Sequence, residues 1–151
     1  TSVNFGLQNL EAVLNAIIGT DDPIMLKLEN LLRSDIEFSR SNSVLIKLYN
    51  VLTGECNSEL AQRIASDVES ITASVYRKAI EDGQRSGEIR KDIDPGIAAY
   101  LVDNILMNVQ FTYACDYYKE RFKIYTEDEI FQRDSFVIEN ILKFIKAALK
   151  L

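Results

Sequence analysis

Residues 94–115 have the sequence DPGIAAYLVDNILMNVQFTYAC, and this stretch says more about the fold than any other. The opening Asp-Pro pair is a typical helix start, because the aspartate can cap the helix and the proline suits its first position. After that pair, Asp103 is the one charged residue. A helix that covers one side of a small domain has an apolar stripe and a charged opposite face. This helix is apolar nearly all round, so we expect other helices to cover several of its sides, including helices of a second subunit.

Apolar residues recur with the helical period elsewhere too. Between Asn57 and Gly87 they are spaced by three or four positions, which predicts one long helix that begins at Asn57 or Ser58 and ends at Gly87. No segment alternates with a period of two. We therefore predict an all-α domain of approximately six helices that occupies residues 1–151. The shorter helices before Asn57 are expected to end at Gly19, to run from Asp22-Pro23 to about Arg40, and to run from Val44 to Gly54.

The boundaries in the C-terminal third are less clear from the pattern. The polar run KERFKIYTEDE after Tyr118 predicts a connection. Thr126 and Glu129 have the spacing of a capping box. Thr126 could therefore begin the last helix, or a separate turn before Asp134. The last helix carries an apolar face made of Val137, Ile141, Phe144, Ile145 and Ala148.

Composition restricts the possible functions. The chain has 151 residues, of which 47% are hydrophobic and 26% charged, as is typical of one globular domain. The net charge is -6, and acidic domains repel phosphate backbones, so we do not expect these residues to bind nucleic acid themselves. No apolar run is long enough to span a membrane, and we expect no membrane contact. Two cysteines, Cys56 and Cys115, indicate a reduced, cytoplasmic protein, with Cys115 buried as a small apolar residue.

The residues that most enzymes need are missing. The chain contains no histidine, which removes the usual nucleophile–base pairs and most transition-metal sites. No glycine-rich phosphate-binding motif is present. The acidic run Glu127–Glu129 predicts a solvated connection. We therefore predict a protein that is not an enzyme, with no catalytic residue, no metal site and no cofactor.

Polar and aromatic residues favour a ligand pocket. Asn104, Asn108, Gln110 and Thr112 lie within the apolar helix. Buried amides need hydrogen-bond partners, so these residues either bond to neighbouring helices or face a ligand. Small-molecule sites combine apolar walls with a few polar anchors. The predicted ligand-binding residues lie between the third, fourth and fifth helices, with Phe38, Tyr49, Tyr76, Met107 and Phe111 as walls and Asn108 and Tyr113 as polar anchors.

The stretch Val75–Leu106, VYRKAIEDGQRSGEIRKDIDPGIAAYLVDNIL, resembles the C-terminal regulatory domain of the TetR/AcrR family of transcriptional repressors. The upstream run LLRSDIEFSRSNSVLIKLYNVL is similar to the medium and short helices of that family. The order and register of the matching elements carry the resemblance. These elements are Gly83, Gly87-Glu88-Ile89-Arg90, Asp92-Ile93-Asp94-Pro95 and the Ala98-Ala99 start of the next helix.

The resemblance implies an effector-sensing and dimerisation domain. Family members bind an operator as dimers through an N-terminal helix-turn-helix domain, and their remaining helices bind an inducer and dimerise. The last two long helices form a four-helix bundle with those of the partner. No helix-turn-helix segment is found in these 151 residues, so we expect operator DNA to be contacted only through such a domain, absent from this chain. A small, largely apolar ligand is expected to release the repressor from DNA.

The resemblance and the apolar helix together predict a homodimer. One alternative is a helical adaptor or structural dimer that binds no ligand, which a closed interior would favour. Another is a small carboxylate-dependent enzyme, which needs two acidic side chains that converge in an apolar cleft. The expected interface residues are Val102, Leu106 and Val109 on the apolar helix, with Ile141, Phe144, Ile145 and Ala148 on the last helix.

Overall fold

The computed structural model describes residues 12–55 and 57–150, and most of them are helical. No strand occurs in these ranges, so the prediction of an all-α fold is confirmed. The helices in these ranges are more numerous than the approximately six expected. They are a stretch at residues 12–18, α2 (Ile24–Ser41), α3 (Ser43–Glu55), α4 (Ser58–Ile64), the π-helical turn η1 (Ala65–Glu69), α5 (Ser70–Ser86), α6 (Pro95–Ala114), α7 (Asp116–Tyr125), the 3-10 turn η2 (Ile130–Gln132) and α8 (Asp134–Leu149).

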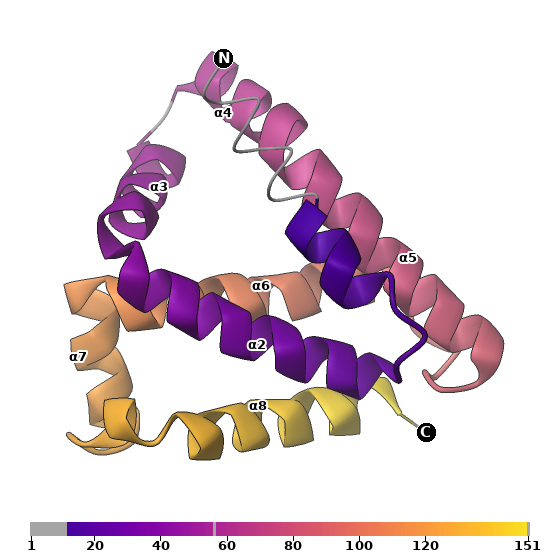
Figure 1. Cartoon of the computed structure of the whole chain (residues 1–151). Coiled ribbons are helices and arrows are strands. Elements are labelled where there is room, and N and C mark those ends of the chain that lie inside the picture. Colours follow the sequence, from indigo (N-terminus) through magenta and orange to yellow (C-terminus); the bar gives the residue numbers. More distant parts are fainter. Residues whose placement is uncertain (1–11, 56, 151) are drawn as a thin grey trace.

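Helix α6 is the one predicted from the sequence at 94–115, and it lies at the centre of the fold. Asp94 caps it by accepting a hydrogen bond from the backbone N–H of Ile97 at 2.9 Å, and Pro95 is its first residue. The helices α2, α3, α5 and α7 pack against it. In Figure 1, α2 crosses in front of α6, and α8 runs below α2.

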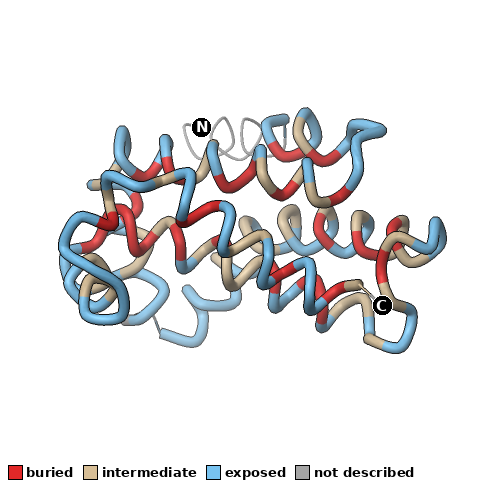
Figure 2. Tube along the Cα trace, turned by 90° about the horizontal axis from the view of Figure 1, so that it is seen from below, coloured by how far each residue is buried: buried red, intermediate tan, exposed pale blue. Residues whose placement is uncertain are grey.

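The chain itself covers much of α6. Val102 and Leu106 are buried, and Figure 2 shows buried positions interspersed with exposed ones along the longer helices, as expected where only one side faces the core. In the N-terminal half of α6, however, Ile97, Tyr100 and Leu101 are 59%, 66% and 51% exposed. An uncovered apolar strip therefore remains on this helix. That a second subunit covers it stays a prediction.

The long helix expected between Asn57 and Gly87 is present, with one irregular turn. Asn57 caps α4 by accepting the backbone N–H of Leu60 at 2.9 Å. Gly87 ends α5 with φ at 82°, in the left-handed region that favours glycine. Between α4 and α5 the chain forms the π-helical turn η1. Such turns are frequent at functional sites, and this one carries Glu69, which bonds to α3.

The connection predicted after Tyr118 is wrong in its first part, because residues 116–125 form α7 and the connection begins only at Thr126. The apolar helix ends at Cys115, whose backbone is extended, and the chain turns there into a second helix. Charged residues dominate α7, so its helical period is hidden in the sequence. Phe122 anchors it through a ring contact with Phe131, at 5.9 Å between centroids.

Of the two alternatives for Thr126, a separate short turn before Asp134 is confirmed, and the capping box that would begin the last helix is wrong. The hydroxyl of Thr126 donates to the carbonyl of Phe122 at 2.7 Å, a bond that belongs to the end of α7. The last helix, α8, begins at Asp134 after the short turn η2. A serine or threonine hydroxyl can bond to the carbonyl four residues before it as readily as it caps the next helix, and spacing alone does not distinguish the two.

The start of α2 differs from the prediction as well. Asp22 does not cap it, since its carboxylate accepts the hydroxyl of Thr20 at 3.1 Å and α2 begins at Ile24. The backbone N–H of Ile24 donates instead to the carboxylate of Glu88, at 3.1 Å. Because Glu88 lies 64 residues further along the chain, no local pattern could indicate this cap.

We expect Glu88→Ala to lower the free energy of unfolding by about 1 kcal/mol, as the loss of helix caps generally does. The Glu88 carboxylate also faces the positive end of the α2 dipole. Urea denaturation of the variant measures the loss. A matched control is Glu37→Ala, which removes an exposed carboxylate from α2 itself and should change stability by less than about 0.5 kcal/mol. Equal losses in the two variants would contradict the capping role.

The α5–α6 loop, residues 87–94, also holds the end of α8. The backbone N–H of Arg90 donates to the carbonyl of Leu149 at 2.7 Å. From the end of α5, Gln84 Nε2 donates to the carbonyls of Arg90 and Ile93, at 3.1 and 2.9 Å. Together with the Glu88 bond, these contacts fasten the ends of α2, α5 and α8 to one short segment.

Gly83 permits the close packing of this loop on α5. A Cβ at Gly83 would lie 2.5 Å from the Cδ1 atom of Ile89, which is buried. Gly83, Glu88, Ile89 and Arg90 belong to the motif that carries the family resemblance. The motif therefore consists in large part of residues that pack this loop.

Two expectations drawn from composition concern cysteines and membranes. Cys115 is buried, as predicted, whereas Cys56 lies outside the described residues. None of the helices that the structure describes has the length and apolar character that a membrane span needs.

Candidate functional site

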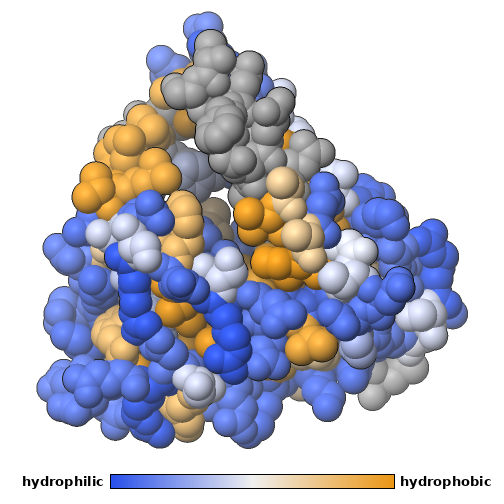
Figure 3. Space-filling view, viewed as in Figure 1, coloured by the Kyte–Doolittle hydropathy of each residue, from blue (hydrophilic) through white to orange (hydrophobic). Residues whose placement is uncertain are grey.

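A cavity of about 480 Å³ lies between α3, the continuous η1–α5 helix and α6. This is the region between the third, fourth and fifth predicted helices. The volume falls within the usual range of small-molecule sites, roughly 300–1,000 Å³. Figure 1 shows how these helices are arranged, and Figure 3 shows a hollow in the surface between α3 and the stretch at residues 12–18. The lining residues are Tyr49 and Thr53 from α3, Glu69, Ala73, Tyr76 and Arg77 from the η1–α5 helix, and Gly96, Ala99, Tyr100, Asp103, Asn104 and Met107 from α6.

The cavity brings together three of the seven predicted ligand-binding residues: Tyr49, Tyr76 and Met107. A fourth, Phe111, lies next to it, because its ring centroid is 6.3 Å from that of Tyr49. Phe111 belongs to a small buried cluster at the α3 end of α6, which Met107 also contacts. These four aromatic and apolar residues therefore form one continuous surface along α3, α5 and α6.

The other three predicted residues lie elsewhere. Phe38 is exposed on α2, and the side chain of Asn108 lies on the exposed side of α6. Tyr113 is buried at the far end of α6, where its ring contacts Phe131 edge-on at 5.2 Å and Arg40 lies over it at 5.0 Å. Tyr113 thus packs the α6–α8 end of the molecule, nearly two helical turns beyond Met107, the last residue of α6 that lines the cavity.

Three carboxyl groups that sequence reasoning did not assign to the site dominate its chemistry. Glu69 accepts a hydrogen bond from the hydroxyl of Tyr49, which joins the π-helical turn to α3. Burial, together with the charge on Glu69, raises the pKa of Asp103 to about 6. Asp103 is the single charged residue of the apolar helix. This isolated charge is the sequence signal that could have placed it in the pocket.

Asp35 lies behind the cavity on α2. Gln110 Nε2 donates to its Oδ1 atom at 3.0 Å. Burial raises the pKa of Asp35 to about 7; the bond from Gln110 opposes this rise and the charge of Asp103 adds to it. Gln110 therefore serves a neighbouring helix, and Thr112 bonds within α6, to the carbonyl of Asn108 at 2.7 Å.

The hydroxyl of Tyr76 opens into the cavity. The residue is 4% exposed, and burial raises its pKa further than the nearby carboxylates do. Its hydroxyl makes no hydrogen bond to any described residue, yet no side-chain oxygen or nitrogen in the described ranges is both fully enclosed and without a partner. The Tyr76 oxygen must therefore be reached from the cavity.

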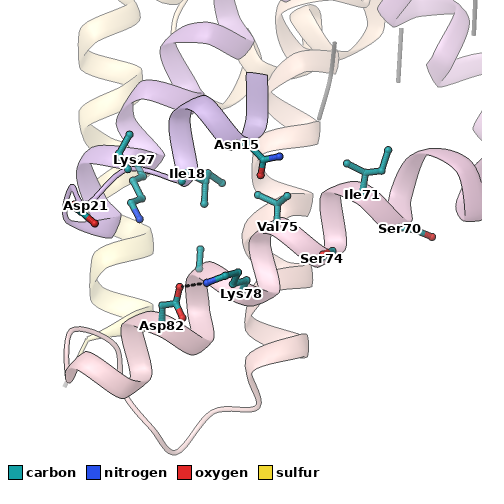
Figure 4. Close-up of a pocket in the computed structure, with 13 residues that line it drawn as sticks. Asn15, Ile18, Asp21, Lys27, Ser70, Ile71, Ser74, Val75, Lys78 and Asp82 are labelled. Atoms are coloured by element: carbon teal, nitrogen blue, oxygen red, sulfur yellow. Dashed lines mark hydrogen bonds and ion pairs between the residues drawn. The ribbon is translucent and has the colours of Figure 1, made fainter. Parts of the chain in front are cut away.

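A second, larger cavity of about 620 Å³ lies between residues 12–21 and α5. Figure 4 shows that Lys27, Lys78, Asp21 and Asp82 lie around it, with Lys78 paired to Asp82 at 2.8 Å. Its charged groups are on the surface or pair with one another. None of the predicted ligand-binding residues lines it. We therefore regard the first cavity as the better candidate for a ligand-binding site.

The predicted interface residues fall into two groups. Val102, Leu106, Val109 and Ile145 are buried in the core of the chain itself, so a partner cannot contact them unless the core opens. Phe144 is 70% exposed, Ala148 is exposed and Ile141 is half-buried. An apolar groove of about 430 Å³ lies beside these residues and includes Ile105, Phe122, Phe136, Ile141 and Phe144.

Comparisons with known proteins do not indicate a function for this chain, so the site is interpreted from its geometry. No family model, curated protein or solved structure matches this chain. Within the described residues there is also no group of three or more histidine, cysteine, aspartate or glutamate side chains arranged to hold a metal ion.

Proposed function

We propose that this chain is the effector-binding and dimerisation domain of a TetR-like transcriptional regulator, in which a small, largely apolar ligand releases a repressor from DNA. The observation that carries the proposal is the cavity between α3, α5 and α6, lined by Tyr49, Tyr76 and Met107. Inducer sites need apolar walls with a few polar anchors, which these residues supply. The α5–α6 loop adds support, because its packing uses the motif that resembles the family.

In this proposal the DNA is contacted by an N-terminal helix-turn-helix domain, and the cavity controls it from a distance. A ligand shifts the equilibrium between two conformations only by the difference in its affinity for them. Dimeric regulators of this kind bind half-sites one helical turn apart. A ligand that favours a conformation with another spacing of the two DNA-binding heads therefore weakens operator binding.

The dimerisation part rests on an apolar face that the chain leaves exposed. On α6 the exposed or half-buried residues Ile97, Leu101 and Ile105 follow one another at helical spacing. On α8, Phe144 and Ile141 continue this surface across the groove they share with Ile105. Large apolar faces on helices are typical of obligate two-fold interfaces. We propose that this face, more than the buried residues beneath it, forms the four-helix bundle with a partner.

The carboxylate-enzyme alternative has one observation in its favour, since Glu69 and Asp103 line the same cavity. Glu69, however, already accepts the hydroxyl of Tyr49, which reduces its capacity to act as a base. A ligand that binds and stays chemically unchanged distinguishes a sensor from an enzyme, and the titration described next records both.

Ligand binding can be tested through the two methionines of the chain. Met107 lines the cavity, whereas Met25 lies at the start of α2, packs against the core and does not line the cavity. In the protein labelled with ¹³C at the methionine methyl groups, titration with 1-decanol, indole and 2-naphthol is expected to shift the Met107 signal for at least one compound. The Met25 signal should stay in place.

A cavity-filling variant provides the control. Ala73→Trp places a large ring in the cavity and is expected to weaken binding at least about tenfold. Ala61→Trp adds the same ring on the exposed side of α4, outside the cavity, and should leave affinity unchanged. If no compound shifts Met107, or if Ala73→Trp binds as well as the unaltered chain, the effector site is not this cavity.

A further inference from the structure

The charges around the cavity are unbalanced. Of the three charged residues that line it, Glu69 and Asp103 are acidic. The third, Arg77, pairs through its Nε with Oε1 of Glu81 on its own helix, at 2.9 Å. Neither Glu69 nor Asp103 has an ion-pair partner among the described residues. Asp35 adds a third carboxyl group behind the cavity, bonded to the neutral amide of Gln110.

The remaining lining suits a positive charge that carries an apolar body. The rings of Tyr49, Tyr76 and Tyr100 come from three different helices, and Ala99 and Met107 supply apolar wall. Cations bind favourably over aromatic faces, most strongly where water is excluded. Tyr76 adds a hydroxyl group with no hydrogen-bond partner among the described residues, and its oxygen can accept a hydrogen bond from a ligand N–H.

An anionic ligand would meet the opposite conditions. It would have to approach two carboxyl groups with Arg77 already engaged by Glu81. A neutral ligand would fit the walls but would leave the carboxyl groups of Asp103 and Glu69 without a charged partner in a partly buried site, which is costly. A cation removes that cost, so the electrostatics select among the ligands that the shape admits.

We propose that the cavity between α3, α5 and α6 binds an organic cation, an amine or quaternary ammonium with an apolar or aromatic body, with Asp103 and Glu69 as its counter-charges and the tyrosine rings as its walls. This inference rests on the proposed effector site and names the class of ligand it takes. It also gives the π-helical turn a role, because η1 holds Glu69 towards the cavity and Tyr49 fixes the orientation of that carboxylate.

Two probes of the same shape test the charge directly. Benzyltrimethylammonium carries a cation, and neopentylbenzene has a carbon atom in place of its nitrogen. Binding of each is followed by the methyl signal of Met107, with Met25 as the internal reference. We expect the ammonium compound to bind about tenfold more tightly or better. Phenylacetate, an anion of comparable size, should bind most weakly of the three.

Variants then assign the preference to particular residues. Asp103→Asn should abolish most of the tenfold preference by weakening the binding of the ammonium compound, and it should not weaken the binding of neopentylbenzene. Glu69→Gln, which still accepts the Tyr49 hydroxyl, should have a smaller effect in the same direction. Asp128→Asn makes the same change of net charge on the exposed connection after α7 and should leave the preference intact.

The outcomes separate the two proposals. If neopentylbenzene shifts Met107 as strongly as the ammonium compound, or if Asp103→Asn keeps the preference, the cation inference is wrong and the effector site stands. If neither probe shifts the Met107 signal but 1-decanol, indole or 2-naphthol does, the cation inference is again wrong and the effector site stands. If no compound of either set shifts Met107, both proposals fail. An unchanged Met25 signal shows that a variant is folded. If the Asp103→Asn variant is not folded, the result for Glu69→Gln decides whether the cation inference holds.

Discussion

Phe144→Glu is expected to convert the proposed dimer into folded monomers. Phe144 is 70% exposed in the chain, so a charge there costs the isolated subunit little. In the proposed interface the same charge is buried against apolar residues of the partner, which should weaken association by at least about a hundredfold, or about 2.7 kcal/mol. Sedimentation velocity across a range of concentrations measures the change, and circular dichroism shows that the helices persist.

Two further variants make this test specific. Val44→Glu introduces the same charge at another exposed apolar position, 78% exposed on α3 outside the proposed face, and should leave the dimer intact. Leu106→Glu should unfold the chain instead, because Leu106 is 1% exposed in its core; we expect a loss of at least about 3 kcal/mol. A Phe144→Glu protein that sediments as an unchanged dimer would remove this face from the interface.

Asp35→Asn is expected to stabilise the protein at pH 8 and to have little effect at pH 4. The pKa of Asp35 is raised from 3.8 to about 7, mainly by burial, and the facing groups Asp103 and Gln110 act on it in opposite directions. Between these two pH values the folded chain binds a proton that the unfolded chain has lost. Stability should therefore fall as pH rises from about 4 to about 7 and then stay level.

The asparagine variant has no such titration, so the difference between the two proteins should grow across the same interval. It keeps an oxygen that accepts the bond from Gln110. The full shift corresponds to about 4 kcal/mol, and we expect about 2 kcal/mol because the residue retains some solvent contact. Urea denaturation at pH 4, 6 and 8 measures it. Asp128→Asn should follow the pH profile of the unaltered chain, and a flat profile in that chain would show that Asp35 is ionised at no cost.

Local signals explain what could be predicted from the sequence. Asn57, Gly87 and Asp94 each act within a few residues of their position, and all three perform the capping roles expected of them. The helical period likewise predicted that Tyr49 and Tyr76 lie on the inner sides of their helices. The sequence pattern does not show which helices are neighbours; the expected arrangement came from the resemblance to the TetR/AcrR family.

Interactions between distant segments explain what could not. The Glu88 cap on α2, and the bond from Gln110 to Asp35, join residues that are 64 and 75 positions apart. Asp103 appeared in the sequence as one charge on an apolar helix, but its carboxylate neighbours come from α2 and from η1. Because pKa values depend on such neighbours, the acidic character of the cavity became visible only in the folded chain.

The α5–α6 loop also determines where the molecule can move. It fastens α2, α5 and α8 at one end, while the continuous helix from Ser58 to Ser86 extends away from it for roughly 40 Å, at about 1.5 Å per residue. Such a helix behaves as a lever with its fulcrum at the loop. A rotation of about three degrees there would hardly disturb the fastened end but would displace α4 by about 2 Å. A molecule bound beside Tyr76 lies between the loop and α4. A small widening of the cavity there would therefore be amplified into a larger displacement of α4.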